Sequence, residues 1–363
     1  ILIMRICFIC GSMELGKDGV GDYTRRLAGE LIRQGCQVAV IAINDCHIKM
    51  TLQEFQKDEQ ESIPVLRLSN QTSWKDKVDI AKEFLKEFEA DWLSLQYVPY
   101  SFHKKGLAWQ LPSFLMRLDF KGRWHVMLHE LWIGINPQSS FKHKIIGRIQ
   151  AYITLRLIHY LSPRLITTSN VLYMEVLKSK GVQTQHLPLF SNIPYISSQP
   201  EEVNQRYHIP SNALVIGVFG TLYPNARLND MFNQILLEKQ HKPIICLSFG
   251  RIGSKEIWSV LQEKWKGKVQ FLLLGELDQK EVSTIMQRVN IAFSCTPLEY
   301  IGKSGVYAAW KRHGVPVKAL SYKTFPDYQR SLEIEYQNME KLVASSWDVE
   351  TVCKTFLKLV GNF

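Results

Sequence analysis

The strongest constraint on the fold is an alternation of short apolar runs with longer segments that have helical spacing. It begins with RICFIC, continues with a helix expected from Asp22 to Gln34, and returns to an apolar run at Gln37–Ile43. Gly35 stands where a glycine commonly ends a helix. Strands joined by helical crossovers lie parallel, so the pattern predicts an α/β fold built on doubly wound sheets.

The alternation is interrupted once and then restarts. A polar, proline-containing segment at 189–212 is typical of a linker with a short helix. We therefore expect two Rossmann-like domains facing a cleft, at 1–190 and 191–345, followed by a closing helix within 346–363 that could pack back on the first domain. The further predicted strands are Trp92–Gln96, Trp124–Leu128, Leu165–Thr168, Leu214–Phe219, Ile244–Ser248, Val269–Leu274 and Ile291–Ser294.

Composition excludes several classes of protein. The 363 residues are 46% hydrophobic and 21% charged, and no apolar run reaches the ~18 residues of a membrane span. The start ILIMRICFIC is too short for a signal peptide and resembles a buried strand, so we expect a cytoplasmic protein. The seven cysteines lack the paired spacing of a metal site. Cys7 and Cys10 both lie in the first predicted strand, which favours buried thiols over a redox pair.

The net charge of +10 is concentrated in one part of the chain. Residues 97–190 hold twelve lysines and arginines and only three acids, a net charge of +9. Such a field attracts phosphates or an anionic membrane, which allows peripheral association with the inner membrane face. Nucleic acid is not expected as a partner, because no zinc-finger spacing or RNA-binding aromatic strand is present. An ordinary solvated basic surface remains the alternative.

Ligands of open α/β sheets bind beyond the carboxyl ends of the strands, so the loops there are the candidate sites. After the first strand, Gly16, Gly19 and Gly21 allow close backbone approach near a helix start whose unpaired N–H groups suit an anion. Their spacing is not the dinucleotide fingerprint G-x-G-x-x-G, and a tight turn is the alternative. The fingerprint also has an acid at the end of the second strand, and Asp45 lies slightly farther along the sequence than that acid would.

Two further loops carry polar residues. His129 follows the predicted strand Trp124–Leu128, where it could donate a hydrogen bond to a ligand, act as acid or base, or be structural. The stretch PLEYIGKSG places Glu299 before a helix that opens at Lys303, Ser304 and Gly305. The positive helix end, the hydroxyl and the ammonium group together predict a phosphate site with a carboxylate beside it. The alternative is a capped core helix with a solvated glutamate.

The motifs taken together resemble the GT-B nucleotide-sugar glycosyltransferases, in particular the large retaining group called family 4. The resemblance covers nearly the whole chain, and the order of its pieces is more specific than any one of them. The pieces are GVGDYTRRLAGELIRQG, HVMLHE, LITTSN, VIGVFGTL, VQFLLLGELDQKEVSTIMQRVNIAFSCTPLEYIG and HGVPV.

The resemblance implies roles for the candidate residues. The second domain would bind the nucleotide diphosphate and the first the acceptor. Gly19 and Gly21 would lie against the donor phosphates or sugar, and His129 would contact the transferred sugar. Glu299 matches the first acid of the family's paired-glutamate motif and would hold sugar hydroxyls. The β-phosphate would be bound by Lys303, Ser304 and Gly305, next to Gly302.

The resemblance also implies a hexosyltransferase that retains anomeric configuration. The donor would be a UDP-, GDP- or dTDP-sugar, with no further cofactor and no metal, since a D-x-D motif is absent. The acceptor would be a glycan, a lipid-linked sugar or a small molecule, as in polysaccharide biosynthesis. A leaving-group phosphate oxygen would take the proton of the acceptor, so no dedicated base is required.

The chain departs from the family pattern at the second glutamate. The two alignments of that motif place it at Tyr307 or Ala309, and neither side chain is a carboxylate. The family also has a phosphate-binding cation after the first strand of the second domain. The nearest cation here is Arg227, one position later in the sequence than the family pattern places it. These departures leave open a non-catalytic GT-B protein that serves as a partner or glycan-binding subunit. A sugar-nucleotide epimerase is the third alternative.

Overall fold

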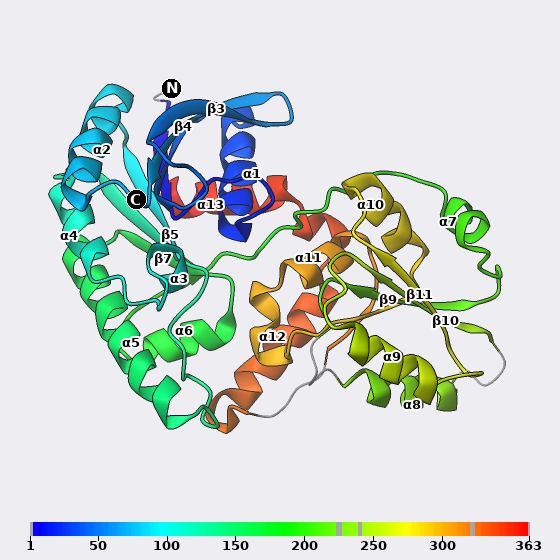
Figure 1. The fold of residues 1–363 in the computed structure, drawn as a ribbon. Coiled ribbons are helices and arrows are strands. Elements are labelled where there is room, and N and C mark those ends of the chain that lie inside the picture. Colours follow the sequence, from blue (N-terminus) through cyan, green and yellow to red (C-terminus); the bar gives the residue numbers. More distant parts are fainter. Residues whose placement is uncertain (1–2, 223–226, 239–241, 320–323, 362–363) are drawn as a thin grey trace. The chain divides into compact units, whose positions relative to one another are not determined.

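The computed structural model describes residues 3–222, 227–238, 242–319 and 324–361 (Figure 1). The chain forms two compact units, one made of residues 1–188 with 349–363 and the other of residues 189–348. We call them unit 1 and unit 2. The sequence placed the corresponding boundaries after residues 190 and 345. No helix among the described residues has both the length and the apolar character needed to cross a membrane.

Unit 1 contains an eight-stranded sheet in the order β3-β4-β2-β1-β5-β6-β7-β8. All neighbouring strands are parallel except β3 and β4, which form an antiparallel hairpin at the edge. The sequence did not single out this hairpin, because β3 is largely exposed and lacks a continuous apolar run. The strands are β1 (Arg5–Cys10), β2 (Gln37–Asp45), β3 (Leu52–Asp58), β4 (Glu61–Ser69), β5 (Trp92–Tyr97), β6 (Arg123–Leu128), β7 (Leu165–Thr168) and β8 (Gln185–His186).

Helices cover both faces of this sheet (Figure 1). Helices α1 and α13 pack against each other on one face, and α2, α4 and α5 lie on the other. In α13 the buried Phe356 ring lies 6.3 Å from that of Phe8 in β1, so the closing helix completes the core of unit 1. The helices are α1 (Gly19–Arg33), α2 (Trp74–Phe88), α3 (Pro99–Phe102), α4 (Gln110–Arg117), α5 (Phe141–Leu161), α6 (Val171–Lys178) and α13 (Val349–Gly361).

Unit 2 contains a five-stranded parallel sheet in the order β11-β10-β9-β12-β13. The strands are β9 (Leu214–Phe219), β10 (Ile244–Phe249), β11 (Gln270–Gly275), β12 (Ile291–Phe293) and β13 (Val317–Lys318). The helices are α7 (Pro200–Tyr207), α8 (Leu228–Glu238), α9 (Lys255–Lys264), α10 (Gln279–Arg288), α11 (Gly305–Arg312) and α12 (Gln329–Lys341), with 3-10 turns η1 (Leu298–Lys303), η2 (Pro326–Tyr328) and η3 (Ala344–Trp347).

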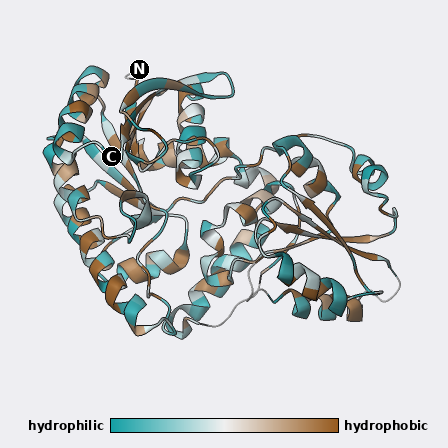
Figure 2. Ribbon diagram, in the orientation of Figure 1, coloured by the Kyte–Doolittle hydropathy of each residue, from teal (hydrophilic) through white to brown (hydrophobic). Residues whose placement is uncertain are grey.

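Alternate side chains of the unit 2 strands enter two separate cores. Val215 of β9 packs in a cluster that includes residues of α10, α11 and α12. Its neighbours Leu214 and Ile216 pack in a second cluster, with α8 and α9. Both faces of the strands are therefore apolar, and they are mostly brown in Figure 2. This explains why the strands were recognisable as continuous apolar runs, and the prediction of a doubly wound α/β chain is confirmed.

The cysteines of the first strand behave as structural thiols. Cys7 and Cys10 are buried in β1, and no cysteine of the described residues is in a disulfide. Burial raises the pKa of the thiols of both residues. The prediction of buried strand thiols is confirmed.

Candidate functional site

In unit 2 the strand order changes direction between β9 and β12. Crossovers lead from β9 to β10 and β11 on one side and from β12 to β13 on the other. Ligands of such sheets bind at this switch point, beyond the carboxyl ends of the two strands. The loop after β9 contains Gly220, at which an added Cβ would lie 3.8 Å from Cγ2 of Val306 in the first turn of α11. The start of α11 therefore lies at the switch point.

Ser304 caps α11. Its side-chain oxygen accepts a hydrogen bond from the N–H of Tyr307 at 3.2 Å and lies 3.1 Å from the hydroxyl oxygen of Thr296. At Gly305, an added Cβ would meet no atom of the described residues within 4 Å, so these residues leave space beside the positive helix end. Lys303 precedes the cap, with its ammonium nitrogen 5.7 Å from the ring centroid of Tyr300. The helix entrance thus has the features expected of a phosphate site.

Glu299 lies in η1, together with Gly302, and is only 2% exposed. Its Oε1 accepts a hydrogen bond of 3.3 Å from the N–H of Thr324. The alternative of a solvated glutamate is therefore wrong. Burying a carboxylate is costly unless it has hydrogen-bond partners, which a backbone N–H supplies here.

The two positions at which the family pattern places a second glutamate face the core of unit 2. Tyr307 is fully buried, its hydroxyl donates to Oε1 of Glu340 at 2.5 Å, and its ring meets that of Trp347 edge-on at 5.4 Å. Ala309 is also buried. A carboxylate at position 307 would face that of Glu340, and one at position 309 would enter the apolar core, so the packing of α11 disfavours an acid at both positions.

Arg227 immediately precedes α8. Its Nε donates to Oδ2 of Asp230 at 2.5 Å, and half of the side chain is exposed. The ion pair partly neutralises the charge that the sequence assigned to phosphate binding. Residues 223–226, which connect it to the end of β9, lie outside the described residues.

The glycine-rich loop of unit 1 differs from its prediction. Helix α1 begins at Gly19, and the Asp18 carboxylate accepts from the N–H groups of Val20 and Gly21 at 2.9 and 2.8 Å. The expectation of unpaired amides is therefore wrong for these two groups, and a carboxylate at this helix end disfavours an anion. Gly21 has a packing role, because an added Cβ would lie 2.5 Å from the carbonyl oxygen of Ser12. At Gly19 an added Cβ would meet none of the residues that the structure describes within 4 Å.

Asp45 at the end of β2 is fully occupied by protein partners. It accepts from Arg67 at 2.7 Å and from the backbone N–H groups of Met13 and His47. Burial acts to raise the pKa of its carboxyl, but these hydrogen bonds lower it overall. Asp45 is thus a structural anion.

His129 follows β6 and is 9% exposed. Its Nε2 lies 2.9 Å from Oε1 of Gln96, and its ring meets that of Tyr23 in α1 edge-on at 4.9 Å. Burial lowers the pKa of His129 to about 3, so the imidazole is neutral near pH 7. The hydrogen bonds that continue from Gln96 to Met127 determine which ring nitrogen of His129 carries the proton.

A chain of buried polar groups runs from His129 across the sheet. Gln96 Nε2 donates to Ser94 Oγ at 2.8 Å, and Ser94 Oγ lies 2.8 Å from Nδ1 of His125. His125 Nε2 in turn lies 2.8 Å from Thr167 Oγ1. The chain ends where Thr167 donates to the thioether sulfur of Met127 at 3.0 Å.

The terminal sulfur sets the direction of every bond, because a thioether only accepts. Because the Thr167 hydroxyl donates to the sulfur, its oxygen must accept from Nε2–H of His125, and Nδ1 of His125 then accepts from the Ser94 hydroxyl. Ser94 in turn accepts from the amide nitrogen of Gln96. The amide oxygen of Gln96 therefore faces His129, which must donate from Nε2. Nδ1 of His129 is left as an acceptor, suited to a hydroxyl of a ligand rather than to a phosphate.

Sequence reasoning identified His129 but missed the residues that orient it. The signal was present in WLSLQY, where Ser94 and Gln96 interrupt an otherwise apolar and fully buried strand. Buried polar groups need hydrogen-bond partners, so two of them on one face of a strand predict a polar network in the core.

The same pair of doubly wound α/β units is found in solved proteins of the GT-B fold, over nearly the whole chain. Sucrose-phosphate synthase from Thermosynechococcus elongatus has this fold in common with the chain, at a TM-score of 0.62 and 14% identity over 99% of this chain and 98% of that one. HepE from Anabaena, solved in complex with UDP, matches with a TM-score of 0.60 and 14% identity over 99% of this chain and 100% of the other.

UDP-GlcNAc 2-epimerase from Neisseria meningitidis, bound to UDP-GlcNAc, also matches, with a TM-score of 0.54 and 10% identity over 99% of this chain and 100% of that one. No protein-family model matches the sequence, and no curated protein sequence matches it. At these identities the similarity establishes the GT-B fold, and the chemistry has to be argued from the site.

Proposed function

We propose that the protein is a hexosyltransferase that transfers a sugar from a nucleotide-diphosphate donor to a glycan, lipid-linked or small-molecule acceptor, with retention of configuration and without a metal. The observation that carries the proposal is the start of α11. There a positive helix end, Lys303 and open space beside Gly305 occur together at the strand switch point of unit 2.

The chemistry assigned to unit 2 is stabilisation of the leaving group. When the bond between the sugar and the diphosphate breaks, negative charge grows on the β-phosphate. A fixed ammonium group and helix amides lower the energy of that charge without rearranging. Glu299, buried beside Gly302, would accept hydrogen bonds from the sugar hydroxyls, and Arg227 would reach a phosphate by giving up part of its pairing with Asp230.

In unit 1 the neutral His129 would accept a hydrogen bond at Nδ1 from a hydroxyl of the transferred sugar. Its lowered pKa makes it a poor general base. The proton of the acceptor would pass to a phosphate oxygen of the departing diphosphate, while Gly19 would lie against the donor.

The test is calorimetric titration of UDP, GDP and dTDP into the wild type and three variants. Lys303→Ala removes the ammonium group, and Ser304→Asp keeps the helix cap but adds a negative charge where the β-phosphate would bind. Both should weaken binding of one preferred nucleotide at least tenfold, since a charge-assisted bond contributes about 1.5–3 kcal/mol. Lys255→Gln, an exposed site on α9, is the control and should bind like the wild type. Failure of all three nucleotides to bind the wild type would contradict the proposal.

A non-catalytic GT-B protein is the second candidate, favoured by the burial of positions 307 and 309. It predicts that the folded protein consumes none of the UDP-, GDP- or dTDP-sugars with any acceptor. An epimerase, for which the Neisseria meningitidis neighbour is the reason, would instead convert UDP-GlcNAc with no acceptor present. Measuring donor consumption with and without acceptors separates the three candidates.

A further inference from the structure

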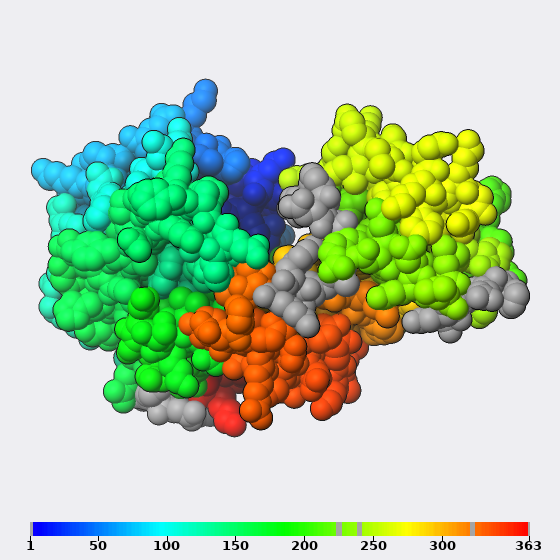
Figure 3. Space-filling model, turned by 90° about the horizontal axis from the view of Figure 1, so that it is seen from below, coloured from blue at the N-terminus to red at the C-terminus, as the bar shows by residue number. Residues whose placement is uncertain are grey.

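Helix α5 exposes an unusual outer face. It is 21 residues long, and its buried residues, including Ile153 and Leu157, form one stripe facing the rest of unit 1. The opposite stripe, at helical spacing, alternates bulky apolar and basic side chains; its exposed members are Phe141, Lys144, Ile145, Arg148, Tyr152 and Arg156. Figure 2 shows brown and teal side by side along the helix, and Figure 3 shows this part of unit 1 in green on the viewed face.

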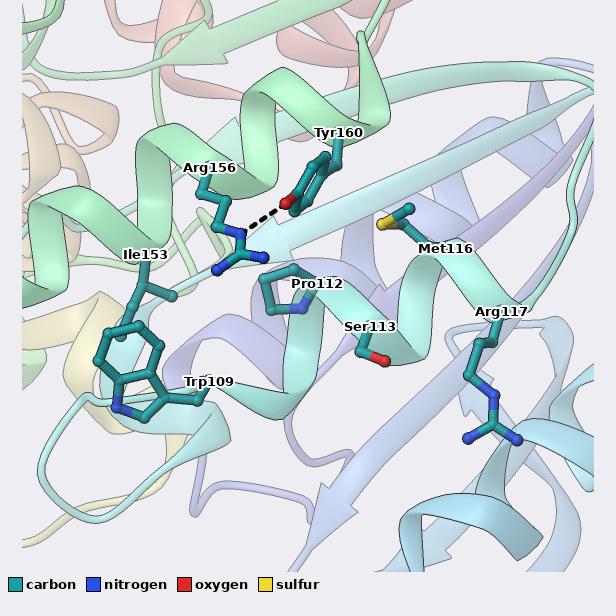
Figure 4. A pocket seen from close by; sticks show the side chains of 8 residues that line it. All are labelled: Trp109, Pro112, Ser113, Met116, Arg117, Ile153, Arg156 and Tyr160. Atoms are coloured by element: carbon teal, nitrogen blue, oxygen red, sulfur yellow. Dashed lines mark hydrogen bonds between the residues drawn. The ribbon is translucent and has the colours of Figure 1, made fainter.

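The neighbouring α4 extends this face. Trp109 immediately precedes α4 and is 52% exposed, and its ring lies 6.2 Å from that of Tyr152, which is 55% exposed. Between the helices is a pocket of about 350 Å³, shown in Figure 4. Its lining includes Met116 and Arg117 of α4, and Arg156 of α5, whose Nε donates to the hydroxyl of Tyr160 at 2.8 Å. We call the outer faces of α4 and α5 together the α4–α5 surface.

The charge of this surface is entirely positive. Residues 99–118 and 135–161 contain no aspartate or glutamate. The loop before α4 adds two lysines, because Gln150 of α5 donates to the carbonyl oxygen of Lys105 at 2.9 Å and holds the loop against the helix. The cations of the surface are Lys104, Lys105, Arg117, Lys142, Lys144, Arg148 and Arg156. No ion pair joins any of them to a described residue.

We propose that the α4–α5 surface binds an anionic phospholipid bilayer, with α5 lying in the plane of the headgroups. The cations would contact lipid phosphates, while Trp109, Phe141 and Tyr152 would enter the boundary with the acyl chains, where aromatic side chains are preferred. A second copy of the chain would bring two positive surfaces together and is disfavoured. Nucleic acid matches the charge but leaves Phe141, which is 78% exposed, and Ile145 without an apolar environment.

The experiment is sedimentation of the full chain with vesicles of phosphatidylcholine alone or mixed equally with phosphatidylglycerol. Binding is expected to the mixed vesicles only, and to be largely lost in ~0.5 M salt because surface charges are then screened. A Lys144→Gln, Arg148→Gln double variant should bind at least tenfold more weakly, because each cation near the membrane surface raises the affinity about fivefold. A Trp109→Ser, Tyr152→Ser variant should also bind more weakly and should lose less of its binding than the charge variant in low salt.

The matched control is Lys255→Gln with Lys268→Gln, two exposed lysines of unit 2, which should bind like the wild type. Circular dichroism melting curves establish that each variant is folded. The proposal is overturned if the wild type does not sediment with anionic vesicles, or if the control loses as much binding as the charge variant. It is equally overturned if inorganic phosphate at matched ionic strength displaces the protein, or if duplex DNA binds it more tightly than the vesicles do. None of these readouts requires glycosyl transfer.

Discussion

At the scale of single residues, the buried polar chain of unit 1 gives His129 a defined protonation state. Gln96 presents its oxygen to Nε2 of His129 because the bonds beyond it end on the sulfur of Met127. A strand with an apolar face in place of Ser94 and Gln96 would leave the imidazole free to adopt either tautomer. The tautomer of this histidine is therefore decided through Gln96 by residues farther along the chain of bonds, such as Thr167 and Met127, that do not hydrogen-bond to it.

Gln96→Glu tests the contact between Gln96 and His129. A carboxylate at position 96 would stabilise the imidazolium, so the pKa of His129 should rise from about 3 toward its ordinary range. NMR titration of the histidine ring signals measures this pKa directly. His313 of unit 2 serves as the internal control, since its ring nitrogens contact Ser283 and the carbonyl oxygen of Ala309 and belong to no part of this chain of bonds. An unchanged His129 pKa in the variant would show that the pair is not formed.

A pH dependence of stability follows from the two buried histidines. Burial holds the pKa of both His125 and His129 at about 3, below the ordinary value near 6.5. Below pH 6.5 the unfolded chain takes up protons that the folded chain does not. The free energy of unfolding should therefore fall as the pH falls from 6.5 toward 3, by up to about 1.4 kcal/mol per pH unit for each histidine.

Urea unfolding between pH 7 and pH 5 measures this slope, and His125→Gln should reduce it. His47 is exposed, so His47→Gln is the control and should keep the wild-type slope. Equal slopes in the wild type and His125→Gln would mean that His125 is not buried in its neutral form.

At the scale of elements, α11 shows how much a local pattern reveals. The sequence predicted a helix opening at Lys303–Gly305, and the helix is present with Ser304 as its cap. The pattern could not show that Tyr307 and Ala309 turn inward, because that depends on the contacts of α11 with η3 and with Glu340 of α12. The start of α1 was misjudged for a similar reason, since the competing cap Asp18 was overlooked.

Ser304→Ala and Ser304→Asp separate the structural role of this residue from its proposed role in binding. Alanine cannot accept from the N–H of Tyr307, and loss of such a cap costs about 1 kcal/mol of stability. Aspartate keeps an acceptor and should retain wild-type stability, while weakening nucleotide binding. Denaturant midpoints measure the first effect. Ser73→Ala, which removes the cap of α2 in unit 1, is the matched control and should destabilise without affecting nucleotide binding.

At the scale of the whole molecule, each unit has its own core. Both apolar clusters of unit 2 are built only from residues between 189 and 348. Unit 1 instead depends on the end of the chain, because α13 packs on α1 and Phe356 contacts both Phe8 and His125. Unit 1 therefore cannot close its core without α13.

The separate core of unit 2 predicts that a fragment of residues 189–348 folds alone. Under the proposed function, it should bind the preferred nucleotide within about tenfold of the full chain, because the phosphate site at α11 lies within it. Calorimetry on the fragment measures this affinity, and the Lys303→Ala fragment is the control. A folded fragment that fails to bind, beside a full chain that binds, would show that unit 1 supplies essential contacts.

The sequence by itself determined the alternation of the central parallel strands with helices and the restart after the linker, but not the β3–β4 hairpin at the edge of unit 1. Parallel strands are buried on both faces, so each requires a continuous apolar run that is visible without any tertiary information. The sequence also located the helix start at Ser304, because capping is a local interaction. Tertiary structure alone decided the tautomer of His129, the burial of Glu299 and Tyr307, and the joining of α4 and α5 into one outer face. Each of these joins side chains from distant segments, and only packing brings such segments together.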